Sequence, residues 1–437
     1  MSFIQKNIKR VAIIGGGPGG LAAARALRSE GHFDTITIFE RNNHTGGTWK
    51  YTPETNPPPP IPSTNALLVD RTLRTKELYS PIYADLHTNL PKSVMCFQDA
   101  AFPEDAPLFL HHEQVMRYLN ELAIKEDLMP LIRFSTLVQR VRYYENKVWK
   151  VTTSEGTTED FDAVVVATGH YAVPYIPDIP GLDELNDNRR IQLMHSRDYR
   201  TPEPFKDKTV LVVGGGSSAN DIVRETASVA TKVYQSIRTH TELSRQAVER
   251  NPPNVQQISL ISHIDNDEDI SSVQLQDDVL EDVDVIIFGT GYLYSFPFLP
   301  FQRDDLIMTG QKVHHLNHYM FYKKNPTLCF LGLPIRVVPM PLMQRQSIVM
   351  ARYWAGKIPM VPHVEMDSMD DARLDFVMGV AREIQYSEQL GAWAQGYTDK
   401  KSMEQWQSDD PVTGRLSENW IELRKNALLL RYDYLGY

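Results

Sequence analysis

Short apolar runs that end in glycine-rich turns recur along this chain, and the first of them lies near the N-terminus. Val11–Ile14 is an uninterrupted apolar run, and Gly15–Gly20 follows it directly. Residues 21–28 are mostly alanine, leucine and arginine, which are strong helix formers. Residues 35–39 form a second β-rich run, and Glu40 comes next. The pattern predicts strand, glycine turn, helix and strand, which together make a βαβ unit.

The same plan recurs 199 residues later, because Gly214 stands where Gly15 stood (214 − 15 = 199). One repeat at this distance predicts two similar domains rather than a solenoid. The predicted elements are a strand at Thr209–Val213, a turn at Gly214–Ala219, a helix opening at Asn220–Arg224 and a strand at Lys232–Ser236.

Two further predicted strands end in a Thr-Gly pair, at residues 163–169 and 283–291. The proline-rich residues 173–180 are typical of a connector, and the prolines of residues 56–62 predict an extended, exposed surface loop. After residue 360 the pattern becomes helical and aromatic, with Trp393, Trp406 and Trp420 in packing positions.

Composition and charge narrow the class of protein. The 437 residues are 42% hydrophobic and 23% charged, as in an ordinary globular protein. Lys and Arg number 45 against 55 Asp and Glu, so the net charge of −10 argues against a nucleic-acid partner.

Only Cys96 and Cys329 occur, without a CxxC pair or metal-ligand spacing, which favours a reducing compartment. No apolar run approaches the ~18 residues of a membrane span, and Met1–Arg10 is too polar for a secretory signal, so we expect a soluble protein.

The first glycine turn has the spacing Gly15-x-Gly17-x-x-Gly20 between a strand and a helix, with Glu40 closing the next strand. Glycines there let backbone amides approach a pyrophosphate at the helix N-terminus, and an acid in the place of Glu40 binds ribose hydroxyls. Because a carboxylate repels a 2′-phosphate, the motif predicts FAD or NAD rather than NADP. A tight turn without a ligand is the alternative.

The second turn, Gly214-x-Gly216-x-x-Ala219, is followed by a strand that ends without an acid. Ser236 and Arg238 stand instead where a 2′-phosphate would lie, and arginine pairs well with phosphate. We therefore predict NADPH at this turn. The alternative is that Arg238 is a solvated surface charge.

Two shorter motifs follow the first turn. Gly46-Gly47-Thr48-Trp49 combines glycines that permit close backbone approach to a planar ring with a tryptophan that can cover it. Thr88-Asn89-Leu90-Pro91 is ordinary turn chemistry taken alone. The sequence contains no nucleophile elbow, P-loop, metal-ligand spacing or redox dithiol. With two nucleotide sites and none of these groups, the chemistry is expected to belong to a cofactor.

Taken in order, these motifs resemble the flavin-containing monooxygenases, class B flavoprotein monooxygenases, in their compact form without a C-terminal membrane tail. The linker signature of that family, FxGxxxHxxx(Y/F), is half present: His195 and Tyr199 match, whereas Arg189 and Ile191 replace Phe and Gly. The residues that carry the resemblance are Gly15–Gly20, Glu40, Gly46–Trp49, Leu86–Pro91, Ala167–His170, His195–Arg200, Gly214–Ala219, Gly289–Tyr292 and Pro326–Leu333.

The resemblance implies an α/β fold with two dinucleotide-binding, Rossmann-like three-layer domains, the NADPH domain being inserted into the FAD domain. The expected boundaries are 1–172 for the first part of the FAD domain, 173–292 for the NADPH domain, and 293–437 for the returning part with C-terminal helices. NADPH would reduce the flavin, and O₂ would then form a C4a-hydroperoxyflavin that oxygenates a soft nucleophile. The expected products are N-oxides of amines of the N,N-dialkylamine type, or S-oxides of thiols and thioethers.

The resemblance also assigns residues. Asn89 is the predicted catalytic residue, holding the nucleotide and oxygen geometry beside the flavin, whereas His195 is expected to be structural. The predicted FAD residues are Gly15, Gly16, Gly17, Pro18, Gly19, Glu40, Arg41, Thr48, Trp49, Thr88, Asn89, Val138 and Gln344, the last facing the flavin ring. The predicted NADP residues are Gly214, Gly216, Ser217, Ser218, Ala219, Asn220, Ser236 and Arg238.

Three other functions stay open from the sequence: a Baeyer–Villiger or N-hydroxylating monooxygenase, an NADPH oxidase that releases hydrogen peroxide, and a non-catalytic flavin or NADPH sensor. The expected partners are a small amine, thiol or thioether and O₂, without nucleic acid or an integral membrane segment. We expect a cytoplasmic protein. Peripheral association with the endoplasmic reticulum and a homodimer are left open.

Overall fold

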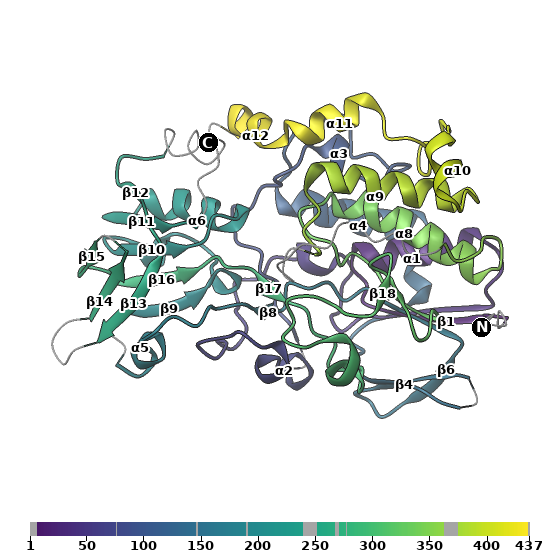
Figure 1. Cartoon of the computed structure of the whole chain (residues 1–437), viewed down its shortest axis with the longest axis horizontal. Coiled ribbons are helices and arrows are strands. Elements are labelled where there is room, and N and C mark those ends of the chain that lie inside the picture. Colours follow the sequence, from purple (N-terminus) through teal and green to yellow (C-terminus); the bar gives the residue numbers. More distant parts are fainter. Residues whose placement is uncertain are drawn as a thin grey trace.

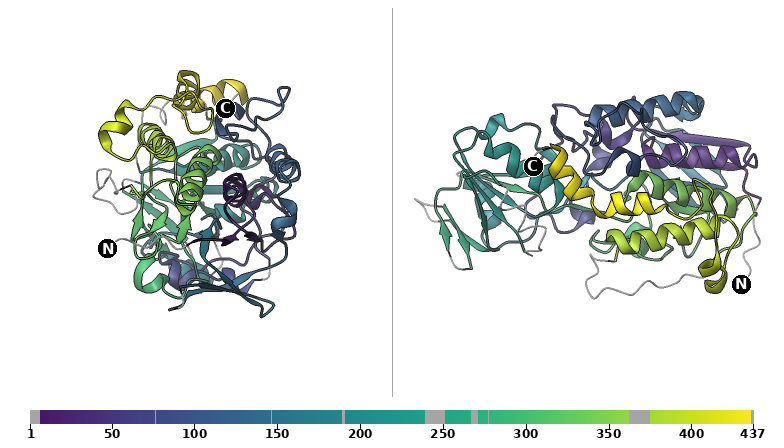
Figure 2. Two further views of the ribbon diagram at one scale, coloured as in Figure 1. Left: turned by 90° about the vertical axis from the view of Figure 1, so that its right-hand side faces the viewer. Right: turned by 90° about the horizontal axis from the view of Figure 1, so that it is seen from above.

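A computed structural model describes residues 7–75, 77–145, 147–188, 191–238, 251–266, 271–276, 278–361 and 375–435 of the chain. Figures 1 and 2 show two lobes, one built from both ends of the sequence and one from its middle. None of the helices in these ranges is both long and apolar enough to cross a membrane.

The larger lobe contains a seven-stranded sheet in the order β18-β19-β20-β7-β1-β2-β3. Strands β20, β7, β1, β2 and β3 run parallel to one another. Beyond β20, β19 pairs antiparallel with β20, and β18 pairs antiparallel with β19. The sheet therefore joins strands from before and after the middle lobe. Their bounds are β1 Arg10–Ile14, β2 Thr35–Phe39, β3 Ile132–Arg133, β7 Ala163–Val166, β18 Leu316–Asn317, β19 Phe321–Tyr322 and β20 Leu328–Phe330.

Alternation along β1 places side chains on both faces of this sheet, as a strand requires. Val11 and Ile13 pack in the cluster of the helical layer, whereas Ala12 and Ile14 pack on the side of a small antiparallel sheet. Both faces are thus covered, giving three layers (Figure 1). The helices are α1 Pro18–Ser29, α4 His112–Lys125, α8 Pro339–Trp354 and α9 Gly379–Ala394, and the small sheet is β4 Val138–Tyr143, β5 Trp149–Thr153 and β6 Thr158–Phe161.

Shorter helices complete the larger lobe. Trp393, Trp406 and Trp420 are 1%, 1% and 8% exposed, so the packing positions expected after residue 360 are confirmed. The bounds are α2 Ala66–Val69, α3 Lys92–Met95, α10 Lys400–Gln405, α11 Glu418–Lys425 and α12 Ala427–Leu435.

The middle lobe contains a parallel five-stranded sheet in the order β12-β11-β10-β16-β9. Its faces are again covered on both sides, because Val210 and Val212 pack with α6 and Leu211 packs on the opposite face. The bounds are β9 Gln192–His195, β10 Thr209–Val213, α6 Ser217–Ala227, β11 Lys232–Ser236, β12 Val255–Ile258 and β16 Val285–Phe288, with α5 Leu182–Asn188 and a small sheet of β13 Ile261–Asn266, β14 Ser271–Leu275 and β15 Val279–Leu280.

The two crossings between the lobes lie side by side. Strand β8 (Val173–Pro174) pairs antiparallel with β17 (Tyr292–Leu293), so the chain enters and leaves the middle lobe at one place. The predicted α/β fold with one dinucleotide-binding domain inserted into another is confirmed. The segment boundaries 172/173 and 292/293 stay a prediction.

The proline-rich residues 56–62 differ from the expected exposed loop. Asn56 is 6% exposed, and its side chain bonds both backbone groups of Tyr79, at 2.7 and 3.0 Å. Pro57 and Pro58 are exposed, but residues 59–62 are half-buried. The expectation of full exposure is wrong here because side chains distant in sequence hold the loop against the protein. Of the two departures from the linker signature, Ile191 is buried and Arg189 lies outside the described residues.

Candidate functional site

The first glycine turn is shaped by a buried carboxylate. Glu40 is 6% exposed; its Oε2 accepts a hydrogen bond from the Gly16 amide at 2.6 Å, and its Oε1 accepts one from the Asn42 amide at 2.8 Å. Gly15 adopts φ +106°, and a Cβ there would lie 2.5 Å from the carbonyl oxygen of Ala167. Burial raises the pKa of Glu40. The acid predicted to bind ribose therefore also fixes the turn.

Gly46 and Gly47 bring a second loop against that turn. The Gly46 amide donates to the carbonyl oxygen of Gly16 at 3.2 Å, and a Cβ on Gly47 would lie 3.0 Å from the Cα of Gly17. Thr48 and Trp49 follow in a short 3₁₀ helix, and Trp49 is half-buried. The paired glycines thus serve loop-to-loop packing, a reason that the sequence alone did not reveal.

The other predicted FAD residues divide by their surroundings. Arg41 Nη1 is buried and has no hydrogen-bond partner among the described residues. Val138 is 3% exposed and belongs to the same buried cluster as Phe39, the residue before Glu40. The Gln344 amide accepts from the Gln98 amide at 2.9 Å and donates to Asp99 at 2.7 Å. Both of its polar atoms are therefore used by the chain, and its place at the flavin ring stays a prediction.

Thr88 and Asn89 have different roles in the structure. Thr88 is 3% exposed; its hydroxyl donates to the Leu90 carbonyl at 3.0 Å and accepts from the Leu110 amide at 2.9 Å, which fixes the loop. Asn89 is exposed, and its Nδ2 donates to Ser217 Oγ at 3.1 Å. The predicted catalytic residue therefore touches the first residue of α6, where the second nucleotide turn ends.

The second turn presents exposed residues at the start of α6. Residues 215–218 and Asn220 are exposed, and Asn220 Oδ1 accepts from Gln235 Nε2 at 2.9 Å. Ala219 packs against Gly289, where a Cβ would lie 2.7 Å from the Ala219 methyl group. Gly289 thus leaves room for Ala219, the alanine that takes the third glycine position of this turn.

Ser236 ends the strand that follows the second turn and Arg238 comes two residues later, but only one of them is open to solvent. Ser236 is 2% exposed and its hydroxyl donates to the Ser259 carbonyl at 2.9 Å. Arg238 is exposed. Of the two residues, only Arg238 is open to solvent, and its role in binding a 2′-phosphate stays a prediction.

Arg238→Ala is expected to raise the KM for NADPH about 30-fold and leave the KM for NADH within twofold. Charge-assisted hydrogen bonds to phosphate contribute about 1.5–3 kcal/mol, and NADH lacks that phosphate. Steady-state kinetics with both coenzymes measure the effect. Arg238→Lys keeps the charge but loses the two-pronged geometry, so its KM for NADPH should fall in between. An equal rise for NADH would contradict this role.

His195 is a structural residue with a fixed tautomer. Its Nε2 donates to the Gly291 carbonyl at 3.0 Å, and its Nδ1 accepts from the Arg197 amide at 3.0 Å. Burial lowers the pKa of His195 to about 3. The ring is therefore neutral at physiological pH and supplies neither an acid nor a free base.

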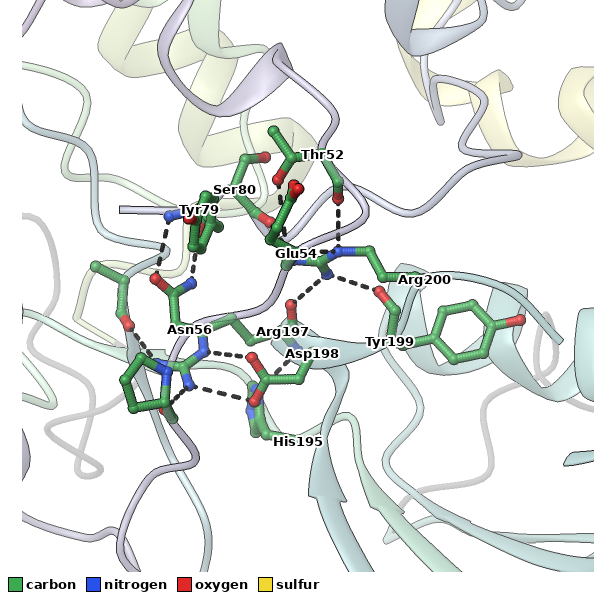
Figure 3. A network of polar contacts seen from close by, with 12 residues as sticks. Thr52, Glu54, Asn56, Tyr79, Ser80, His195, Arg197, Asp198, Tyr199 and Arg200 are labelled. Atoms are coloured by element: carbon green, nitrogen blue, oxygen red, sulfur yellow. Dashed lines mark hydrogen bonds and ion pairs between the residues drawn. The ribbon is translucent and has the colours of Figure 1, made fainter. Parts of the chain in front are cut away.

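Two arginines beside His195 hold loops of the larger lobe against the linker (Figure 3). Arg200 donates to the carbonyl oxygens of Thr52, Glu54 and Ser80, at 2.9, 2.8 and 3.0 Å. Arg197 donates to the Pro57 carbonyl at 2.7 Å. These bonds explain why the proline-rich residues lie against the protein.

Aromatic residues follow the central strands of both sheets, and sequence reasoning gave them no role. His170 contacts Tyr171 and Tyr294 with ring centroids 4.5 and 5.1 Å apart, and Tyr292 contacts Tyr171 and His195 at 5.3 and 5.1 Å. Burial lowers the pKa of His170 to about 4. Their position after Thr-Gly pairs was the signal that could have identified them.

A buried acid on α6 introduces a pH dependence. The Glu225 carboxylate accepts from the Tyr199 hydroxyl at 2.8 Å, and burial raises its pKa to about 7. The Tyr199 hydrogen bond and Arg224 lower this pKa, whereas Asp221 and Asp85 raise it further. The folded protein therefore binds a proton that the unfolded chain releases near pH 4.5.

Stability is expected to fall as pH rises from about 4.5 to about 7, by at most about 1.4 kcal/mol per pH unit from this group. Glu225→Gln keeps a hydrogen-bond acceptor for Tyr199 and removes the titration. The unfolding temperature of the variant, relative to the natural protein, should thus be higher at pH 7.5 than at pH 5. A difference that does not change with pH would contradict the raised pKa.

The two turns fit the dinucleotides predicted for them. At the first turn, glycines hold space that a Cβ would fill, and the buried Arg41 Nη1 offers a donor to a ribose or phosphate oxygen. At the second, exposed residues at the start of a helix and the exposed Arg238 suit a pyrophosphate and a 2′-phosphate. The Asn89–Ser217 contact brings these two places together.

Comparison with known proteins agrees with this geometry. A family described as flavin-binding monooxygenase-like matches residues 68–256 and 252–374, and an NAD(P)-binding Rossmann-like domain family matches residues 13–65. A flavin-containing monooxygenase of Arabidopsis thaliana, FMO GS-OX-like 4, is 33% identical over 91% of this chain and 89% of its own length. A thiol-specific monooxygenase of Saccharomyces cerevisiae is 36% identical over 80% of this chain and 78% of its own.

Solved structures give the same result. The S-allyl-L-cysteine S-oxygenase of Allium sativum superposes with a TM-score of 0.78 at 31% identity, covering 97% of this chain and 93% of that one. A cyclohexanone monooxygenase, at 15% identity and a TM-score of 0.55, shares the fold alone. The chain therefore belongs to the family of flavin-binding monooxygenases, which use FAD and NADPH.

Proposed function

We propose that this monooxygenase oxygenates the sulfur atom of a small thiol or thioether. The supporting observation is that relatives at 31% and 36% identity, each covering most of the chain, are named for S-oxygenation of S-allyl-L-cysteine and for thiol specificity. Oxygenation of an amine nitrogen of the N,N-dialkylamine type is the second candidate, because it uses the same cofactors and the same kind of soft nucleophile.

Two histidines near the lobe junction supply no strong base, which supports a sulfur substrate over an amine. His195 and His170 are neutral at physiological pH, with pKa values lowered to about 3 and about 4. Both ring nitrogens of His195 are already hydrogen-bonded, so this residue does not accept a proton from a substrate. An aliphatic tertiary amine is mostly protonated at pH 7 and must lose that proton to react. A thioether carries no such proton, so its lone pair reacts directly.

When bound and reduced by NADPH, FAD would supply the activated oxygen for this reaction. The residues of the chain bind and orient. The first turn, shaped by Glu40, would hold the flavin nucleotide, and the start of α6 with Arg238 would hold the coenzyme. Asn89, which bonds to Ser217 at the start of α6, would lie between them.

The test compares substrates with the FAD-loaded enzyme. S-allyl-L-cysteine, glutathione, trimethylamine and cyclohexanone are supplied in turn, and NADPH consumed, oxygenated product and hydrogen peroxide are measured. We expect close to one S-oxide per NADPH with a sulfur substrate. Product only from trimethylamine would support the second candidate, product only from cyclohexanone a Baeyer–Villiger enzyme, and peroxide alone an NADPH oxidase. Each of these three results would overturn the S-oxygenation proposal.

A further inference from the structure

The C-terminal helix carries a buried arginine that reaches the other lobe. Figures 1 and 2 show α12, in yellow, at the junction above α6. Arg431 is 4% exposed, and its Nη1 and Nη2 lie 2.9 and 3.0 Å from the two carboxylate oxygens of Asp221. Asp221 is also 4% exposed and belongs to α6. A two-pronged ion pair thus joins residues that are 210 positions apart in the chain.

A third group from the larger lobe completes this contact. The hydroxyl of Tyr83, a residue 3% exposed, donates to Asp221 Oδ2 at 2.5 Å. Arg431 Nη2 also donates to the His87 carbonyl at 3.5 Å, in the same segment as Tyr83. From α6 itself, Arg224 Nη1 lies 3.3 Å from Asp221 Oδ1. Most of the compensation for this buried carboxylate therefore comes from across the junction.

Helix α6 is restrained at two points along its axis. Ser217, its first residue, accepts a hydrogen bond from Asn89, and Asp221 lies one turn further, about 6 Å along the axis. The first contact joins exposed side chains, whereas the second is a buried pair whose separation leaves an uncompensated charge. The second contact is therefore the stronger restraint on the direction of the helix.

We propose that Arg431, acting through Asp221 and Tyr83, is a positioning residue that holds the coenzyme-binding lobe in the orientation from which NADPH reduces the flavin. The contact touches neither nucleotide turn, so it acts on the lobe rather than on a ligand. It does not depend on which substrate receives the oxygen atom. A failed S-oxygenation assay would leave it intact.

Arg431→Met is tested against Arg424→Met. Arg424 of α11 forms a comparable pair, with its Nε 2.8 Å from Glu383 Oε2, but Glu383 lies on α9 of the same lobe. Both variants lose one arginine–carboxylate pair, and only the first loses a link between lobes. Both are compared as FAD-loaded protein.

The first readout is flavin reduction without oxygen. In Arg431→Met, we expect reduction by NADPH to slow at least tenfold, whereas reduction by dithionite and FAD content stay within twofold. Arg431→Lys keeps the charge and should recover part of the rate. In Arg424→Met, the unfolding temperature should fall while the rate with NADPH stays within twofold. An unchanged rate in Arg431→Met, or an equal loss in Arg424→Met, would overturn the proposal.

The second readout does not depend on turnover. Spin labels at Glu155→Cys and Glu281→Cys, exposed positions on the two lobes, report the distance between the lobes by pulsed electron resonance in a Cys96→Ser background. With NADP⁺ present, Arg431→Met should broaden the distance distribution and Arg424→Met should not. If Arg431→Met does not fold, the double variant Asp221→Asn with Arg431→Met removes the unpaired charge. An unbroadened distribution in either form contradicts the proposal.

Discussion

Gly20→Ala is expected to yield a folded protein that has lost most of its FAD. A Cβ at Gly20 would overlap the carbonyl oxygen of Gly15, which is backbone and cannot rotate away. Forcing such an overlap costs about 2 kcal/mol or more, which corresponds to roughly a 30-fold weaker affinity. Flavin absorbance per chain, before and after dialysis against excess FAD, measures the loss.

The adjacent glycine provides the control for this variant. In Gly19→Ala, the new Cβ would lie 3.0 Å from the sulfur of Met343, a flexible side chain that can move by a few tenths of an ångström. Gly19→Ala should therefore retain several times more FAD than Gly20→Ala. The second turn carries Ala219 in the place corresponding to Gly20, where Gly289 leaves space beside it. Full FAD retention in Gly20→Ala would contradict this prediction. It would show that the first turn accommodates an alanine at its third glycine position, as the second turn does.

Asn89→Ala is expected to separate NADPH consumption from oxygenation. Asn89 lies at the junction, with its amide on Ser217 Oγ at 3.1 Å, while the loop around it is fixed by buried Thr88. Losing the contacts of this amide group should raise the barrier to oxygenation by about 1.4 kcal/mol, which corresponds to a tenfold slower step. We expect NADPH oxidation to persist, product per NADPH to fall about tenfold, and hydrogen peroxide to account for the difference.

Ser217→Ala removes the same hydrogen bond but leaves the Asn89 amide in place. If Asn89 acts at the flavin, Ser217→Ala should keep most of its coupling while Asn89→Ala loses it. Equal loss in both variants would mean that the contact between the lobes, rather than the amide, maintains coupling. Complete coupling in Asn89→Ala would remove this residue from the mechanism.

The parts of the fold that could be predicted are those whose signal is local. The strands at Thr35–Phe39, Thr209–Val213 and Lys232–Ser236 match the structure residue for residue. Each lies before or after a glycine turn and its helix, so the βαβ pattern as a whole marks their positions. By contrast, β4 carries glutamine and two arginines in its six residues, since one face of that small sheet is exposed. Its alternation was too polar to identify as a strand.

The positions of the two glycine turns could be predicted from the sequence, whereas the side-chain contacts of the site could not. Glycine spacing revealed both turns, but a hydrogen bond between residues such as Asn89 and Ser217 depends on how two lobes pack. The same holds for Gln344, whose amide bonds to Gln98 and Asp99 from another part of the chain. No local pattern marks Arg431 either, since its partner lies 210 residues away.

The order of strands in the larger sheet has a consequence for synthesis on the ribosome. Strand β7 is made of four fully buried aliphatic residues, and its neighbour β20 ends only at Phe330. Until that residue has emerged, the nascent N-terminal part exposes an unpaired apolar edge, the kind of surface that recruits chaperones or aggregates. The intervening lobe has its own complete sheet and can fold first. If the nascent chain leaves the ribosome before residue 330 is made, the middle lobe should be folded while the larger lobe stays insoluble.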